Sequence, residues 1–181
     1  MGYRIMSPEE ISRIGEVNRE EQLEVEYVPK ADGSGFGLTI ERVERDQPRT
    51  IPPWSEQGVK ARTNAWKKHL DNGGFLYGAF DRERLTGFIL LGAKKADHSA
   101  EVVALFVDQD YRRSGIGQAL MGWAEEKSLS LGVQSLYVYA NPTGSAVDFY
   151  RRAGFEVAGL ISKEVVISLP RDIILAKQLA E

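Results

Sequence analysis

An unbroken apolar run at residues 102–107 is rich in β-branched side chains and predicts a strand buried on both faces. Turn-forming residues come next at 108–110. Apolar residues then return at spacings of i, i+3, i+4, i+7 and i+8, which predicts a helix with one apolar face. These residues are Ile116, Ala119, Leu120, Trp123 and Ala124. The centre of the chain therefore predicts a strand, a turn and an amphipathic helix.

The first half of the chain predicts a strand at residues 3–6 and a short helix that begins with a capping box at residues 7–10. Between residues 22 and 54 the pattern is weaker. Alternating residues suggest a strand around Leu23, Val25 and Tyr27, residues 32–37 a glycine-rich loop, and residues 38–44 a second extended piece. Pro48, Pro52 and Pro53 should interrupt regular structure after residue 44, so we expect an irregular arm.

The remaining elements are predicted from periodicity and from turn residues. We expect a helix at 55–70 capped by Ser55, strands at 75–80 and 85–93 joined by a polar turn, and a third strand at 101–107. A strand at 136–139, a helix at 145–153 ended by Gly154, and strands at 155–167 and 173–179 around Pro170 complete the chain. This mixed α/β order fits neither a doubly wound sheet nor a sandwich.

The turn before the central helix has the chemistry of an anion site. Two arginines and two glycines stand where the first helical N–H groups lack partners, in the sequence Arg112-Arg113-Ser114-Gly115-Ile116-Gly117. A P-loop would require Gly-Lys-Ser/Thr, and a dinucleotide fingerprint would require three spaced glycines; both are missing here. The alternative is a helix start with solvated arginines.

Composition limits the possible functions. The chain has 181 residues, 43% hydrophobic and 27% charged, with a net charge of −3, which suits one globular domain and argues against a dedicated nucleic-acid binder. It contains no cysteine, which excludes thiolate nucleophiles and disulfides, and two distant histidines make a metal site improbable. No apolar stretch approaches the length of a membrane span and no signal-peptide pattern is present, so we expect a cytoplasmic protein that does not bind membranes.

Two motifs in the second half resemble the GNAT family of N-acetyltransferases. Arg112-x-x-Gly115-x-Gly117 after an apolar strand is similar to the family's acyl-CoA pyrophosphate loop, and residues 141–155, with Asn141, Phe149-Tyr150 and Gly154-Phe155, are similar to its second signature. The resemblance implies one N-acetyltransferase domain over residues 1–181, with residues 22–54 as a variable acceptor-side arm. It implies a mixed α+β fold whose mostly antiparallel sheet splays at the acetyl-CoA site and is flanked by helices.

The resemblance also implies the residues that would hold acetyl-CoA, the acetyl donor; no metal is implied. The backbone of Leu105, Phe106 and Val107 would pair with the pantetheine amides as an added strand. The turn would grip the pyrophosphate through Arg112, Arg113, Ser114, Gly115, Ile116, Gly117 and Gln118. Asn141 could bond the pantetheine arm, or could be a simple turn residue before Pro142.

Tyr150 would assist the leaving thiolate if the resemblance holds, although its position on an apolar helix face equally suits a core tyrosine. A phenol of pKa ~10 is a weaker acid than a thiol of pKa ~8.5, so full proton transfer would be uphill by roughly 2 kcal/mol. A hydrogen bond from Tyr150 to the sulfur is therefore the better hypothesis. Glu101 is the candidate base, directly or through water; the alternative is a solvated glutamate at a strand end.

The acceptor would bind beside the arm. Tyr27, Phe36 and Trp54 lie in or next to this segment together with Glu24, Glu26, Glu41, Glu44 and Asp46. Acidic and aromatic groups together suit a cationic amine, although solvated strand faces would give the same composition. A faint likeness to streptothricin acetyltransferases at residues 35–45 and 77–80 makes an antibiotic or another small polyamine the leading hypothesis.

Three functions remain open. The first is direct acetyl transfer to a small-molecule primary amine. The second is acetylation of a protein or peptide amine, which requires an open groove beside the thioester. The third is a sensor that binds acyl-CoA without chemistry. The oligomeric state also stays open, with a homodimer as one option.

Overall fold

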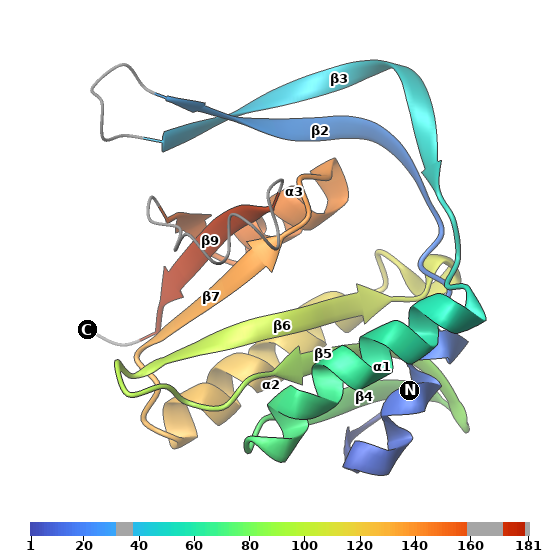
Figure 1. The fold of residues 1–181 in the computed structure, drawn as a ribbon, viewed down its shortest axis with the longest axis vertical. Coiled ribbons are helices and arrows are strands. Elements are labelled where there is room, and N and C mark those ends of the chain that lie inside the picture. The colour runs from blue at the N-terminus through green and yellow to red at the C-terminus, as the bar shows by residue number, and fades with distance from the viewer. Residues whose placement is uncertain (32–37, 159–171, 180–181) are drawn as a thin grey trace.

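The chain forms a seven-stranded mixed sheet and a separate two-stranded hairpin, as a computed structural model of residues 1–31, 38–158 and 172–179 describes (Figure 1). The sheet has the order β1-β4-β5-β6-β7-β9-β8. Its strands are β1 (Gly2–Met6), β4 (Phe75–Asp81), β5 (Arg84–Leu91), β6 (Ser99–Val107), β7 (Ser135–Ala140), β9 (Ile173–Gln178) and β8 (Glu156–Val157). The helices are η1 (Pro8–Glu16), α1 (Glu56–Asp71), η2 (Gln109–Tyr111), α2 (Ile116–Ser130) and α3 (Gly144–Arg152).

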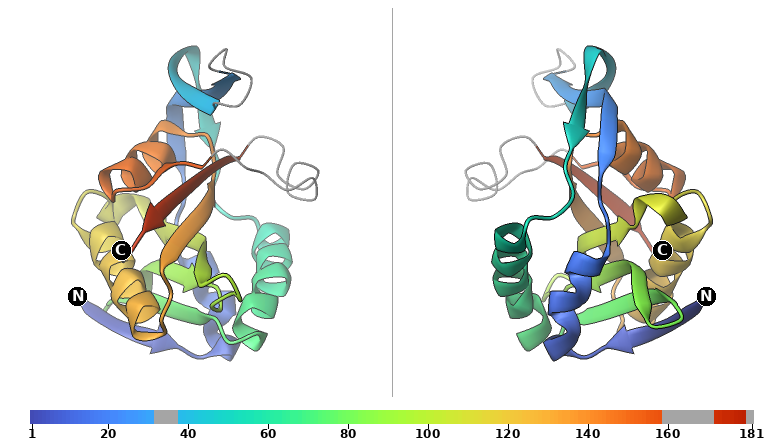
Figure 2. Two further views of the ribbon diagram at one scale, coloured as in Figure 1. Left: turned by 90° about the vertical axis from the view of Figure 1, so that its left-hand side faces the viewer. Right: turned by 90° about the vertical axis from the view of Figure 1, so that its right-hand side faces the viewer.

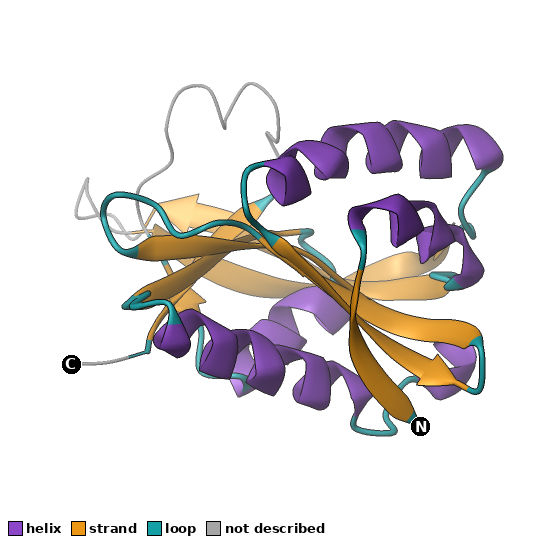
Figure 3. Cartoon of the chain, turned by 90° about the horizontal axis from the view of Figure 1, so that it is seen from below, coloured by secondary structure: helices purple, strands orange, loops and turns teal. Residues whose placement is uncertain are grey.

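Helices cover both faces of the sheet and bury two separate cores (Figure 3). The alternation along β5 shows how one strand serves both: Ile89 and Leu91 enter the core with α2 and α3, while Phe88 and Leu90 enter the core with η1 and α1. The expected fold class, a mostly antiparallel mixed sheet flanked by helices, is confirmed.

The predicted splay between two central strands is present. β6 and β7 run parallel and pair only at Ser99–Glu101 and Ser135–Tyr137. Beyond Glu101 the two strands diverge, as Figure 1 shows, and β6 continues to pair with β5 alone. In that pairing Leu90 faces Ala104 while Leu91 faces Val102, so Val103 is an extra, bulged residue on β6. The sequence pattern did not predict this bulge.

The arm is a long two-stranded hairpin with one irregular stretch at residues 45–48, so the prediction of an irregular segment is wrong for most of its length. β2 (Glu21–Ala31) pairs with β3 (Leu38–Ile51) along nearly its whole length. The register shifts between Leu23 and Val25, so residues 45–48 of β3 stand opposite Glu24 alone. Pro48 lies in this irregularity, where no ladder hydrogen bond is needed from it, and the strand continues beyond it. The strand does end before Pro52 and Pro53, and the expected loop at 32–37 lies outside the described residues. Figure 2 shows the hairpin standing apart from the main sheet.

Two further predictions about the central elements need correction. β6 is not buried on both faces, since Leu105, Phe106 and Val107 are only half-buried where β7 has moved away. On α2, Ala119 is exposed and Met121 is buried instead. Of the strand predicted at 155–167, β8 accounts for Glu156–Val157, and residues 159–171, including Pro170, lie outside the described part.

Candidate functional site

The gap between β6 and β7 leaves backbone groups of β6 without a strand partner on one side. From Val102 to Val107 the strand uses only its β5 edge for the ladder. A buried N–H or C=O group without a partner is costly, so a ligand that carries amides would complete this edge. Leu105, Phe106 and Val107, the predicted pantetheine-pairing residues, all lie in this unpaired segment.

The turn after β6 presents a row of free N–H groups at the start of α2. Within the described chain, no acceptor faces the backbone N–H groups of residues 113–118. Arg113 and Gly115 have positive φ angles of 62° and 89°, which turn the backbone so that successive N–H groups face the same way. Together with the positive end of the α2 dipole, this turn can hold an anion such as a pyrophosphate.

Arg112 points inward rather than into that turn. Its Nε donates to the Val107 carbonyl at 3.3 Å and its Nη2 to the Arg19 carbonyl at 3.0 Å. The nearest carboxylate oxygen is that of Glu21, 4.0 Å from Nη1. Arg112 therefore joins the end of β6 to the base of the arm, and its positive charge lies beside the turn without a direct contact to it.

Asp108 fixes the start of the turn, a role that the sequence did not reveal. Its side chain is fully buried. One carboxylate oxygen accepts from Arg84 Nη2 at 2.6 Å and from the Asn18 N–H at 3.0 Å, and the other accepts from the Asp110 N–H at 3.1 Å. This single carboxylate therefore connects β5, β6 and the segment that leads into the arm. Only the fold brings these partners together, since Asn18 is 90 residues away in sequence.

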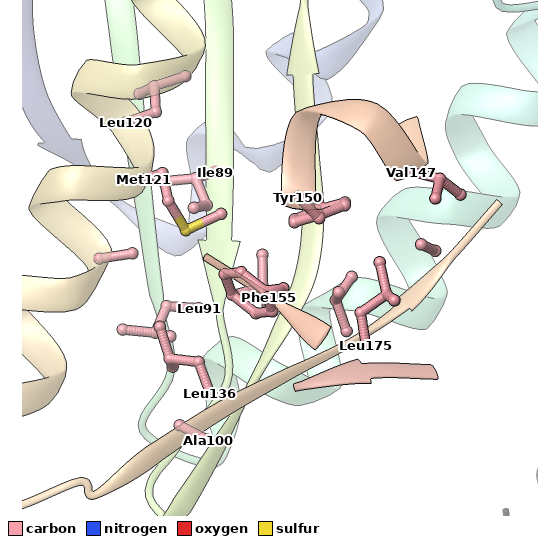
Figure 4. Close-up of a cluster of buried hydrophobic side chains, with 14 of the residues drawn as sticks. Ile89, Leu91, Ala100, Leu120, Met121, Leu136, Val147, Tyr150, Phe155 and Leu175 are labelled. Carbon is pink, nitrogen blue, oxygen red and sulfur yellow. The ribbon is translucent and has the colours of Figure 1, made fainter. Parts of the chain in front are cut away.

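Tyr150 lies on α3 in the core that includes Val138 and Ala140 of β7 (Figure 4). Its ring packs edge-on against Phe149 and Phe155, at centroid distances of 5.3 and 5.4 Å. The side chain is 6% exposed, and burial raises the pKa of its hydroxyl. No hydrogen-bond partner for that hydroxyl exists among the described residues. Tyr150 therefore stays protonated at neutral pH with an O–H group free to donate.

Glu101 lies at the vertex of the gap, as the last residue of β6 that pairs with β7. Its Oε2 accepts a long hydrogen bond of 3.4 Å from the hydroxyl of Tyr137, the residue opposite it. Burial and the charge of Glu101 raise the pKa of Tyr137. The carboxylate is half-buried, so water can reach it. This position allows Glu101 to act as a base through water.

A groove of about 260 Å³ runs between α2 and α3, next to the turn. Gln118, Phe149, Arg152 and Lys177 are among its lining residues. At Gly117, a Cβ atom would come within 3.0 Å of the Phe149 ring, so the glycine allows the two helices to approach closely. Asn141 is exposed in the turn after β7, where its carbonyl accepts from the Thr143 N–H at 2.8 Å.

The three predicted acceptor residues are not brought together. Tyr27 is 5% exposed, and its hydroxyl donates to Asp148 Oδ1 at 2.6 Å, so it fastens the arm to α3. This burial argues against direct contact with an acceptor. Trp54 is half-buried and lies against Phe106 of β6 and Trp66 of α1. Phe36 lies outside the described residues.

Ion pairs offset most of the acidic charge predicted on the arm. Glu26 pairs with Arg45, Glu41 with Lys30 and Glu44 with Arg42. Glu24 and Asp46 are exposed. The arm therefore presents fewer unpaired carboxylates than its sequence suggests.

Among the described residues, no group of three or more His, Asp or Glu side chains is arranged to hold a metal ion. No helix of this part of the chain is long and apolar enough to cross a membrane.

Comparison with known proteins identifies the class to which this architecture belongs. Residues 39–155 match the model of the acetyltransferase (GNAT) family. The chain belongs to this family.

Curated relatives match over part of the chain. The peptidyl-lysine N-acetyltransferase YjaB of Escherichia coli (strain K12) is 33% identical over 79 residues, 44% of this chain and 47% of that protein. An uncharacterized N-acetyltransferase of Methanocaldococcus jannaschii is 42% identical over 69 residues, 37% of this chain and 28% of that protein. The chain thus matches less than half the length of either relative.

Solved structures share the fold over nearly the whole chain. Nourseothricin acetyltransferase superposes with a TM-score of 0.76 at 22% identity, covering 98% of both chains. A Bacillus anthracis protein assigned as a streptothricin acetyltransferase, solved with acetyl coenzyme A, gives 0.70 at 14% identity, covering 97% and 96%. The PaiA N-acetyltransferase of Thermoplasma acidophilum, solved with coenzyme A, gives 0.60 at 20% identity, covering 98% and 99%.

Proposed function

We propose that the chain, as one catalytic domain over residues 1–181, transfers the acetyl group of acetyl-CoA directly to a primary amine of a small molecule. The observation that carries the proposal is the unpaired edge of β6, which ends in a turn with free N–H groups at residues 113–118. A ligand that has amides along its length and a diphosphate at its end matches both features. Acetyl-CoA supplies the acetyl group as an activated thioester.

The backbone of Leu105, Phe106 and Val107 would align the pantetheine arm, and the N–H groups of the turn would hold the pyrophosphate. Arg112 would contribute long-range positive charge while it supports the turn from behind. A free N–H on the β6 edge near the Val103 bulge would polarise the thioester carbonyl, because a bulge redirects backbone groups locally. The groove that contains Arg152 would receive the rest of the nucleotide.

Tyr150 would donate a hydrogen bond to the departing sulfur, since burial keeps its hydroxyl protonated and no described side chain competes for it. Glu101 would accept the proton of the amine through a water molecule at the vertex of the gap. An alkylamine of pKa ~10.4 is mostly protonated at neutral pH, so this step contributes roughly 4–5 kcal/mol to the barrier.

A small acceptor is favoured because the arm docks on α3 beside the gap. The Tyr27 N–H donates to the Pro142 carbonyl at 2.8 Å, and Glu26 forms an isolated bridge with Thr143. An arm held in this way narrows the space that a protein substrate would need. An antibiotic or a polyamine, suggested by the sequence likeness and by the nourseothricin neighbour, is the first compound to test. The ion pairs on the arm weaken the electrostatic argument for a polycation.

Acetylation of a peptide lysine is the second candidate, favoured by the 33% identity to YjaB. The two candidate functions predict acceptors of different size, a small amine or a lysine within a peptide. Short amines and lysine peptides should therefore be compared at equal concentration.

The test is an acceptor screen that follows release of free CoA thiol, which a cysteine-free protein does not obscure. We expect turnover with at least one small amine. Tyr150→Phe should lower kcat at least tenfold with little change in acetyl-CoA affinity, because it removes a contact made to the leaving group. Equal kcat values for the wild-type protein and Tyr150→Phe would remove Tyr150 from the mechanism. An unaltered pH–rate profile for Glu101→Gln would remove Glu101 as the base. Failure to bind acetyl-CoA would end the proposal.

A further inference from the structure

On the α1 face of the sheet, a pocket of about 470 Å³ opens between the base of the arm and α1. Arg19, Pro52, Pro53, Trp54, Ser55, Gly58 and Arg62 line it. The charged groups among these residues are two arginines, and none is acidic. This composition contrasts with the arm, where cations and carboxylates alternate and pair.

Neither guanidinium group forms an ion pair within 4.0 Å in the described residues, although burial raises the pKa of the half-buried Asp172 carboxyl and the charge of Arg62 partly opposes this rise. Arg19 lies over the Trp54 ring at 4.2 Å, and its Nε donates to the Pro52 carbonyl at 3.1 Å. Arg62 lies 5.7 Å from the Trp66 ring centroid. Within the described residues, no carboxylate oxygen comes within 4.0 Å of either group, although ten other ion pairs meet that distance. Burial, together with the charge of Arg62, lowers the pKa of Arg19.

Trp54, one of the lining residues, also has an unused neutral donor. The Trp54 indole N–H is buried and has no hydrogen-bond partner in the described structure. A buried donor without an acceptor costs roughly 1–3 kcal/mol and is retained when a ligand satisfies it. Two guanidinium groups without an ion-pair partner and a nearby N–H donor are groups that can bind an oxyanion.

The pocket lies next to the coenzyme gap. The Trp54 ring packs on Phe106 at a centroid distance of 5.2 Å, and Phe106 belongs to the unpaired segment of β6. The thioester carbonyl is proposed to lie at the Val103 bulge. Phe106 is three residues from Val103 along β6, a distance of about 10 Å in a strand. An acceptor that extends over this distance could hold its amine at the thioester and its far end in the pocket.

We propose that the acceptor carries an oxyanion, which is either a carboxylate or a phosphate, about 10 Å from its reactive amine. Arg19 and Arg62, beside Trp54, bind this anion. This inference rests on the proposed function. The acceptor class is therefore an amino acid, a short peptide terminus or a phosphorylated amine rather than a polycation.

The test uses four amines with one carbon skeleton: aminohexanoate, aminohexyl phosphate, aminohexanamide and diaminohexane. We expect kcat/KM for one of the two anionic compounds to exceed that for the neutral amide and for the diamine at least tenfold. The carboxylate and phosphate arms distinguish the two oxyanions. The double substitution of Arg19→Gln and Arg62→Gln should reduce this preference to near unity and leave the KM for acetyl-CoA unchanged. Lys60→Gln, which removes an exposed cation from the same helix, should keep the preference.

A kcat/KM for the diamine equal to or higher than that for the anionic amines would overturn the proposal. A double variant whose main defect is a raised KM for acetyl-CoA would also overturn it. Calorimetry of the same compounds with the CoA-bound protein gives a readout that does not need turnover. Anion binding that the double variant abolishes supports the inference even if the chemistry is not acetyl transfer, whereas equal binding to both proteins contradicts it. Thiol release that occurs with every amine alike supports the proposed function and rejects the anion site.

Discussion

The coenzyme side and the acceptor side of this protein are built in different ways. On the coenzyme side, the unpaired β6 edge and the turn at residues 113–118 act through backbone groups, and side chains serve mainly to support them, as Asp108 and Arg112 do. On the acceptor side, the candidate site depends on side chains such as Arg19 and Trp54. The turn needs only a local backbone conformation, whereas the side-chain site, like the free β6 edge, needs elements that are distant in sequence.

The two sides meet at Asp108, so its removal should have the largest effect on the molecule. Asp108→Ala leaves the Asn18 and Asp110 N–H groups without their acceptor and Arg84 without its counter-charge. We expect a loss of about 3 kcal/mol in the free energy of unfolding. Denaturant titration measures it. Asp110→Ala is the control, because the side chain of that residue is exposed; equal losses in the two variants would show that Asp108 has no special position.

The backbone character of the coenzyme side can be tested at Gly115. Gly115→Ala places a side chain at φ 89°, a left-handed conformation that costs roughly 1–2 kcal/mol. We expect the KM for acetyl-CoA to rise at least tenfold, because the turn relaxes and its N–H groups no longer converge.

Gly73→Ala is the matched control for that substitution. Gly73 has φ 91°, and an added Cβ meets no atom within 4 Å at either glycine, so the conformational strain is the same. Gly73 follows α1, away from the turn. A similar rise of KM in both variants would mean that general destabilisation, and not the shape of the turn, controls binding.

Tyr27→Phe tests how firmly the acceptor side is held. The substitution removes the 2.6 Å hydrogen bond to Asp148 and keeps the buried ring. We expect a loss of about 1 kcal/mol in unfolding free energy and a change in acceptor KM, with the KM for acetyl-CoA unaltered. Proteolysis of the arm and steady-state kinetics measure the two effects. A fall in kcat with no change in stability would indicate instead that Tyr27 contacts the acceptor.

The smallest expected effect lies far from both sites, at Glu10. Its hydrogen bond with Arg4 lowers the pKa of Glu10 to about 2, which is below the unfolded value of ~4.3. Because the folded pKa is depressed, the stabilisation is present above the unfolded pKa and is lost as pH falls toward about 2. The carboxylate is only partly buried and water screens the pair, so we expect Glu10→Gln to cost less than about 1 kcal/mol at neutral pH. Unfolding curves at pH values on both sides of this window should converge for the two proteins at the acidic end.

Much of the fold could be predicted from the sequence because local signals agreed with the final structure. Ser55 caps α1 by accepting from the Gly58 N–H at 3.0 Å, and Gly154 ends α3 at a φ of 88°, both at the positions that the residue types predicted. The hairpin of β4 and β5 also formed around its predicted polar turn. These features depend on neighbours within a few residues, so the sequence contains the required information.

The arm shows where that information ends. Leu23, Val25 and Tyr27 predicted one strand, but the length of the hairpin depends on pairing between residues as far apart as Glu21 and Ile51. Three of the acidic residues predicted to attract a cation formed ion pairs instead, Glu26 and Glu41 across the two strands and Glu44 within β3. Composition reports which charges are present, and only the strand register decides which of them neutralise each other.

By itself, the sequence determined the order of the elements, the glycine turn at the start of α2 and the place of Tyr150 on the buried face of α3. The tertiary structure alone decided that β6 bulges at Val103, that Asp108 connects three distant segments, and that Arg19 and Arg62 line one pocket without an acid. The physical reason is range. Helix caps, turns and periodic faces arise from interactions over a few residues, whereas a bulge, a buried carboxylate and an unpaired cationic pocket exist only after chain segments far apart in sequence have packed.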